Sequence, residues 1–81
     1  MGEIDLILWR PKLIVCVEIK HRQNLDLAAD SITAGQRARI RRAADYFLSR
    51  HPRHAAATIR FDDWYCAPRR WPRHEANVGL D

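Results

Sequence analysis

Four charged residues near the start of the sequence have the types and spacing of a site for phosphodiester hydrolysis. Glu3 and Asp5 interrupt one apolar run, and Glu18 and Lys20 interrupt a second. Carboxylate oxygens are hard ligands that suit Mg²⁺ or Mn²⁺, which also accept a substrate phosphate oxygen. A lysine beside such an ion can orient or activate a water and offset charge that builds up in the transition state.

Two strands must position these residues. Residues 3–9 and 13–20 are rich in Ile, Leu, Val and Trp, which are typical of β-strands. The segment "RPK" between them is a tight connection with Pro11 at a turn position. The two segments therefore predict a β-hairpin.

The register of this hairpin decides whether the charged residues meet. If directly opposed residues have numbers that sum to 23, Asp5 faces Glu18, Glu3 faces Lys20, and all four side chains share one face. Converging carboxylates repel each other unless a cation lies between them. This register therefore predicts a site for a divalent metal ion.

A helix and a further strand follow the hairpin. The segment "QNLDLAAD" predicts a loop, after which Ser31 or Thr33 can cap a helix that runs to about Ser49 and is terminated by Pro52. Residues 57–65 predict a third strand, and the rest of the chain, with two prolines and no clear period, an irregular tail. One α/β domain over residues 1–81 is expected.

The predicted helix is amphipathic with a basic outer face. Its apolar stripe has three- and four-residue spacing, and charged residues occupy the remaining positions. The stripe contains Ile40, Ala43, Ala44, Phe47 and Leu48, and the charged positions are Arg37, Arg39, Arg41, Arg42 and Asp45.

Composition favours a nucleic-acid partner and a reducing compartment. The net charge of +4 comes from 12 Arg and 2 Lys against 10 acidic residues, and guanidinium groups bind phosphate through paired donors. Two cysteines are too few for a disulfide scaffold. No apolar run reaches the roughly 18 to 20 residues that span a bilayer. A cytoplasmic protein outside the membrane is expected.

The ordered set of segments "GEIDLI", "VEIKHR", "ITAGQRARIRRAADYFL", "RFD" and "HEAN" resembles the YraN-like family of predicted endonucleases. More broadly, Asp5 followed after twelve residues by Glu18-x-Lys20 resembles the motif of the restriction-endonuclease-like nucleases, which include archaeal Holliday-junction resolvases. The resemblance implies a metal-dependent DNA endonuclease with a restriction-endonuclease-like core, and branched DNA is the candidate substrate that it suggests. As a bare pattern the motif is weak, whereas the five segments in order are specific.

The resemblance also implies residue roles. Asp5 and Glu18, with the backbone carbonyl of Ile19, would bind Mg²⁺ or Mn²⁺, Lys20 would be the catalytic lysine, and Glu3 is a possible neighbour. The predicted contacts with nucleic acid come from Arg22, Gln36, Arg37 and Arg41. Gln36 stands where the family commonly has lysine, and the loop before the helix lacks the family's usual glycine.

Similar proteins carry a further helix and strand before "GEIDLI". Without them the core would be truncated, and one edge of its sheet would be uncovered. Because an open edge can pair with a strand of another chain, a homodimer or swapped assembly is expected.

Simpler interpretations remain open. The four charged residues could form an exposed ion-pair ladder, although the same face would then expose Ile7 and Cys16. The helix arginines could simply be solvated, and the aromatic residues near the end could complete the core or an interface instead of stacking on bases. The aromatic residues are Trp64, Tyr65 and Trp71, and the weak alternative of a zinc site would use His51, His54, and Cys66 or His74.

Two alternative functions also remain open. One is a non-catalytic nucleic-acid-binding module with a nuclease-like fold, which would bind DNA in a salt-sensitive way without cleaving it. The other is a small interaction subunit that binds a protein at its open sheet edge.

Overall fold

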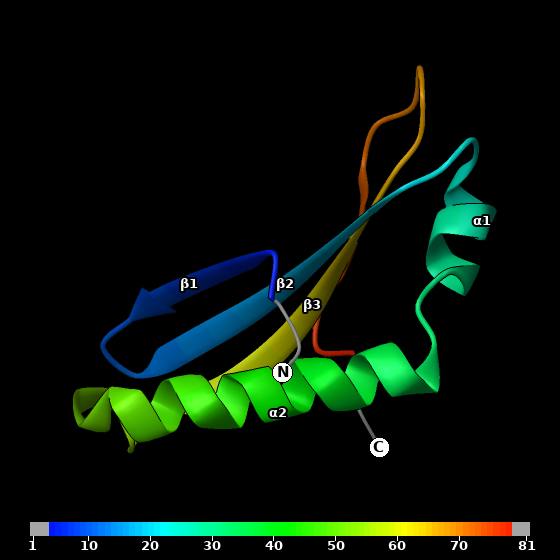
Figure 1. Cartoon of the computed structure of the whole chain (residues 1–81). Helices are drawn as coiled ribbons and strands as arrows, with labels where there is room; N and C mark the ends of the chain where they lie inside the picture. The colour runs from blue at the N-terminus through cyan, green and yellow to red at the C-terminus, as the bar shows by residue number, and fades with distance from the viewer. Residues whose placement is uncertain (1–3, 79–81) are drawn as a thin grey trace.

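The computed structural model describes residues 4–78, which form an α/β arrangement around one mixed sheet. The strands lie in the order β1, β2, β3, β4 (Figure 1). The first pair and the last pair are antiparallel, and β2 and β3 are parallel. The bounds are Leu6–Arg10 for β1, Leu13–His21 for β2, Thr58–Cys66 for β3 and Arg73–Glu75 for β4.

Two helices connect the parallel strands. Helix α1 spans Leu25–Asp30 and helix α2 spans Ala34–Arg50, followed by a short 3-10 turn at Pro52–His54. Thr33 caps α2 in a reciprocal capping box, in which its hydroxyl accepts from the Gln36 N–H and the Gln36 side chain accepts from the Thr33 N–H. This cap fixes where α2 begins.

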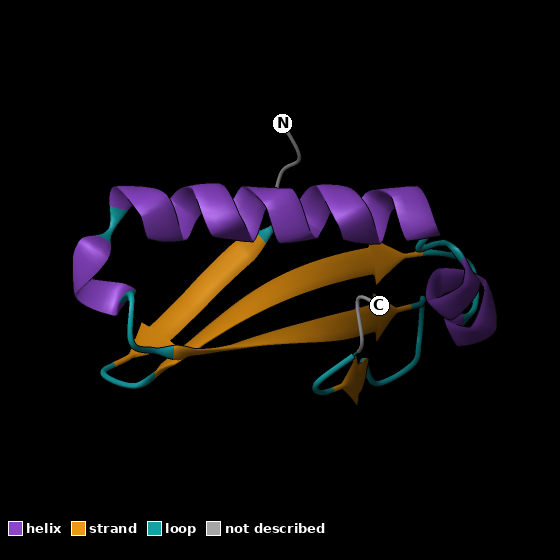
Figure 2. Cartoon of the chain, turned by 90° about the horizontal axis from the view of Figure 1, so that it is seen from below, coloured by secondary structure: helices purple, strands orange, loops and turns teal. Residues whose placement is uncertain are grey.

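Helix α2 lies along one face of the sheet and buries the core (Figure 2). Ile14 and Cys16 of β2 pack with Ala44 of α2, and all three are at most 3% exposed. Burial raises the pKa of the Cys16 thiol to about 11, so this cysteine packs as a small apolar side chain. Around them lie Ile4, Ile7, Phe47, Leu48, Ala57, Ile59 and Phe61.

The opposite face of the sheet is partly open. Leu6, Leu8 and Ile19 are 45%, 50% and 44% exposed there, whereas Val15 and Val17 between them are buried. An apolar surface of this kind is a candidate for contact with another segment or chain.

Most predicted elements are confirmed, and two are wrong. The hairpin, the long helix and the third strand are all present, with bounds shifted by at most three residues, and of the two predicted caps the structure uses Thr33. The segment predicted as a loop instead forms α1, because the Asn24 side chain accepts from the Leu27 N–H at 2.8 Å and caps it.

The second wrong prediction is the irregular tail. Residues Arg73–Glu75 form β4 and pair with Asp63, Trp64 and Tyr65. Within residues 4–78, no helix is long and apolar enough to cross a membrane.

Candidate functional site

The hairpin has the register that brings the predicted acidic residues together. All five observed pairs of β1 and β2, from Leu6 with Val17 to Arg10 with Leu13, have numbers that sum to 23. Asp5 directly precedes β1, and its Oδ2 atom accepts a hydrogen bond from the Ile19 N–H at 2.8 Å. This bond from the backbone of β2 to the Asp5 side chain holds the Asp5 carboxylate beside Glu18.

Glu18 and Lys20 lie on the helix-covered face, since they continue the alternation of the buried residues Ile14 and Cys16. The Lys20 Nζ atom is 3.4 Å from Glu18 Oε1, and the two side chains are 15% and 13% exposed. Both groups are therefore largely removed from solvent, which argues against an exposed ion-pair ladder.

The pKa of Glu18 is raised above its ordinary value. Burial is the main cause, followed by the hydrogen bond and the negative charge of Asp5, while Lys20 partly offsets the shift. Asp5 and Glu18 therefore share a site in which one cation, Lys20, does not cancel two carboxylates. The negative charge that Lys20 does not balance is of the kind that a divalent cation could neutralise.

Asp5 and Glu18 have the type of side chain that a hard metal ion prefers. Asp5 and Glu18 would hold it with carboxylate oxygens, the ligands that Mg²⁺ and Mn²⁺ prefer. Within residues 4–78 these two acids are not joined by a third His, Cys, Asp or Glu to make a group suited to a metal. Glu3, the predicted neighbour, lies outside the described residues, and the predicted contribution of the Ile19 carbonyl stays a prediction.

A second polar network lies next to this site, and the sequence analysis did not predict it. Asp63 of β3 pairs with Glu18 across the parallel strands and is 2% exposed. Its Oδ2 atom accepts from Arg37 Nη2 at 2.9 Å and from the Tyr65 hydroxyl at 2.7 Å. Burial and the Asp63 hydrogen bond raise the pKa of Tyr65 to about 12, so its hydroxyl remains a donor at neutral pH.

Arg37 was expected on the outer basic face of the helix, and this placement is wrong. It is half-buried at the start of α2 and reaches the sheet to pair with Asp63. The available signal was the alternation of Phe61, Asp63 and Tyr65, which puts an acid on the buried face of a strand and demands a partner.

Another buried acid lies on the opposite face of β3. Asp62 is 3% exposed. It accepts hydrogen bonds from the Arg60 side chain at 2.9 Å and from the Asn77 N–H at 3.0 Å, and its Oδ2 atom is 2.7 Å from His74 Nε2. Burial raises the pKa of Asp62, but these partners outweigh it and lower the pKa to about 2. The cluster ties residues 74–77 to the sheet.

The other predicted nucleic-acid contacts are not gathered at one point. Arg22 is exposed and donates to the His21 carbonyl at 2.7 Å, Gln36 serves the helix cap, and Arg41 is exposed on α2. Their contacts with nucleic acid stay predictions.

The histidines of the zinc alternative are engaged in separate contacts. The His51 ring stacks on Phe47 with ring centroids 4.1 Å apart. His54 is buried, and its ring centroid is 5.2 Å from that of Trp9. His74 contacts Asp62. In the described part of the chain they do not form a metal-binding group with Cys66.

The fold and the site together define a class: a small α/β protein with a carboxylate pair and a lysine on the helix-covered face of a mixed sheet. Comparison with known proteins then gives the family. Residues 1–63 match the model of "Uncharacterised protein family UPF0102", and the chain belongs to this family. The recognition of the YraN-like family from its motifs is thereby confirmed.

Several relatives named "UPF0102 protein" match most of this chain. The protein of Methylorubrum extorquens (strain PA1) is 55% identical over 77 residues, covering 95% of this chain and 60% of that protein. The protein of Methylobacterium nodulans is 49% identical over 73 residues, covering 90% and 57%. That of Methylocella silvestris is 49% identical over 81 residues, covering 99% and 65%. The chain thus spans about three fifths of the length of these curated relatives.

Proposed function

We propose that this chain carries a metal-dependent site that hydrolyses phosphodiester bonds of DNA, within a restriction-endonuclease-like core. One observation carries the proposal: the Asp5 and Glu18 carboxylates converge beside Lys20, which is 3.4 Å from Glu18. Two acids and a lysine that meet in a partly buried site are typical of general acid–base and metal-assisted chemistry. A cytoplasmic setting with both thiols, Cys16 and Cys66, reduced is part of this proposal.

Each residue would have a distinct task. Asp5, fixed by the Ile19 N–H, and Glu18 would hold Mg²⁺ or Mn²⁺, which when bound would polarise the phosphate and lower the pKa of water. Lys20 would orient the attacking water and offset negative charge on the five-coordinate phosphorus. Arg37, anchored by Asp63, would approach the DNA backbone from the start of α2.

The test is a cleavage gel. The protein is incubated with Mg²⁺ or Mn²⁺ and with linear, flapped and four-way DNA, and so are the variants Asp5→Asn and Lys20→Ala. Each variant should lower the cleavage rate by at least about 100-fold, because it removes a metal ligand or the group that serves the water.

Matched controls separate this effect from a change of charge. Asp45→Asn on the outer side of α2 and Lys12→Ala in the β1–β2 turn remove the same kinds of charge at exposed positions. Both should cleave as the wild type does. Cleavage by Asp5→Asn or Lys20→Ala at the wild-type rate would refute the proposed roles.

A non-catalytic nucleic-acid-binding module is the second candidate. It is favoured by three arginines that lie apart from the carboxylate pair: Arg69 and Arg70 in the loop between β3 and β4, and Arg73 at the start of β4. Salt-sensitive DNA binding without cleavage in either metal would select this candidate.

We also propose that the chain forms a homodimer through β1. Within residues 4–78 this strand lies at the edge of the sheet, and its residues Leu6 and Leu8 are about half exposed. Light scattering should give twice the chain mass, and Leu8→Lys should shift it towards the monomer. A wild-type monomer at high concentration would contradict the proposal.

A further inference from the structure

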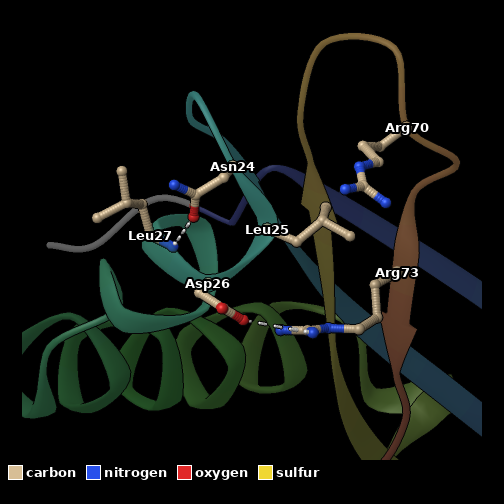
Figure 3. A pocket seen from close by; sticks show the side chains of 6 residues that line it. All are labelled: Asn24, Leu25, Asp26, Leu27, Arg70 and Arg73. Carbon is tan, nitrogen blue, oxygen red and sulfur yellow. Dashed lines mark hydrogen bonds and ion pairs between the residues drawn. The ribbon is translucent and has the colours of Figure 1, made fainter.

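A cleft of about 430 Å³ opens between the start of α1 and the segment that joins β3 to β4 (Figure 3). It is lined on one side by α1 and on the other by two arginines that reach towards it. The lining residues are Asn24, Leu25, Asp26, Leu27, Arg70 and Arg73. None of them is used by the proposed hydrolysis.

The cleft is basic. Arg69, Arg70 and Arg73 lie within five residues, and the single acid of the lining, Asp26, is 91% exposed and 3.8 Å from Arg73. Arg73 Nε is also 3.9 Å from Glu75 Oε1, and this second carboxylate is half exposed. At these distances and exposures, both ion pairs hold Arg73 weakly. The guanidinium of Arg73 lies over the Tyr65 ring, 5.3 Å from its centre, and makes a cation–π contact with it.

Trp71 directly follows Arg70 in the sequence, is not one of the residues that line the cleft, and is 92% exposed, the most exposed of the large apolar side chains described. The other aromatic residues of this region are engaged: Trp64 stacks on His74 at 4.4 Å, and Tyr65 is buried. Before it, Arg69 has a φ of 62°, a left-handed conformation that a residue other than glycine adopts at a cost. An exposed tryptophan among arginines is typical of a surface that stacks a base and binds the adjoining phosphates.

Strand register places this cleft next to the carboxylate site. Lys20 pairs with Tyr65, and Tyr65 pairs with Arg73, so the three residues lie in line across β2, β3 and β4. Two strand spacings put Arg73 about 10 Å from Lys20 at the backbone. A nucleic-acid strand of a few nucleotides can span that distance.

We propose that this cleft binds single-stranded DNA, with Arg70 and Arg73 on its phosphates and Trp71 stacked on a base. The substrate of the neighbouring site is then DNA with an unpaired segment, such as a flap or a branch, and this second step rests on the proposed function. Single-stranded segments are the ones whose bases are free to stack on a protein side chain, whereas the bases of an intact duplex are not.

The binding test uses fluorescence anisotropy in EDTA, so that cleavage plays no part. The probes are a labelled thymidine 12-mer and a labelled blunt duplex of 12 base pairs. Trp71→Ala should weaken binding of the 12-mer by at least about fivefold and change binding of the duplex by less than about twofold, because only the single strand offers a free base. Arg70→Ala should reduce the slope of log affinity against log salt by about 0.7, the value for one phosphate contact.

Two variants serve as controls. Trp71→Phe keeps an aromatic ring and should bind the 12-mer nearly as the wild type does. Arg10→Ala removes an exposed arginine at the end of β1, which pairs with Leu13 at the far end of the sheet from the cleft, and should leave the affinity unchanged. Trp71 and Arg10 are both exposed, so these substitutions leave the core intact.

Equal binding of the 12-mer by wild type, Trp71→Ala and Arg70→Ala would overturn the inference, as would a wild type that binds only the duplex. The outcome is separable from that of the nuclease test. Binding of the 12-mer through Trp71 without cleavage in Mg²⁺ would uphold the cleft and refute the nuclease. If the protein cleaves both duplex and flapped DNA and Trp71→Ala leaves this cleavage unchanged, the nuclease is upheld and the inferred role of the cleft is refuted.

Discussion

A single buried acid, Asp62, and a pair of acids, Asp5 and Glu18, differ in how their negative charge is balanced. Asp62, on the open face, is surrounded by Arg60, His74 and the Asn77 N–H, and these partners lower its pKa to about 2. Asp5 and Glu18, on the helix-covered face, have one nearby lysine between them, and the pKa of Glu18 is raised. The protein compensates the first group fully and the second only in part.

This contrast separates structural from chemical acids. A buried carboxylate with all its partners stabilises the fold, whereas carboxylates left in conflict lower stability unless a ligand relieves them. Perturbed acids of the second kind concentrate at functional sites. Asp62 therefore belongs to the scaffold, and the Asp5–Glu18 pair to the proposed site.

The largest expected effect comes from removing the charge of Asp62. Asp62→Asn should lower the free energy of unfolding by about 2 to 4 kcal/mol, because it removes a buried carboxylate whose oxygens bind Arg60, His74 and the Asn77 N–H. Urea denaturation monitored by tryptophan fluorescence measures it. Glu18→Gln is the matched control and should change the free energy by less than about 1 kcal/mol, or increase it. Equal losses in both variants would remove the contrast.

The pH dependence of stability sharpens the same comparison. The pKa of Asp62 is about 2 in the folded protein, below its ordinary 3.8, so its contribution is complete above about pH 4 and is lost as the pH falls towards 2. The shift corresponds to about 2 kcal/mol. The difference in unfolding free energy between wild type and Asp62→Asn should shrink by about that amount between pH 6 and pH 2.5. A constant difference would contradict the assignment.

A smaller effect is expected at the network beside the proposed site. Tyr65→Phe removes the hydroxyl that donates to Asp63 at 2.7 Å and should cost about 1 kcal/mol of unfolding free energy. Tyr46→Phe is the matched control, since Tyr46 is 44% exposed, and it should cost less than about 0.5 kcal/mol. Equal costs would show that Asp63 does not depend on Tyr65.

Much of the site could be predicted because its signals are local. Charged residues inside apolar strands, a turn at Pro11 and the alternation of side chains were enough to predict the hairpin register that brings Asp5 to Glu18. Ser31 and Thr33 were the two predicted caps of α2, and the structure selects Thr33, whose capping box with Gln36 spans four consecutive residues.

What could not be predicted depends on contacts between distant segments. No local pattern indicates that β2 pairs in parallel with β3, and only this pairing brings Asp63 beside Glu18 and turns Arg37 inwards. The partners of Asp62 likewise come from positions 60, 74 and 77. Helix α1 has only six residues, too few for a periodic signal, and the Asn24 cap was its single local mark.

Metal binding tests the central claim most directly. Isothermal titration calorimetry with Mn²⁺ should show one site in the wild type and in the control Asp45→Asn, with binding at least about tenfold weaker in Asp5→Asn. Equal affinity in wild type and Asp5→Asn, or no binding of Mn²⁺ by the wild type, would show that the Asp5–Glu18 pair is not a metal site.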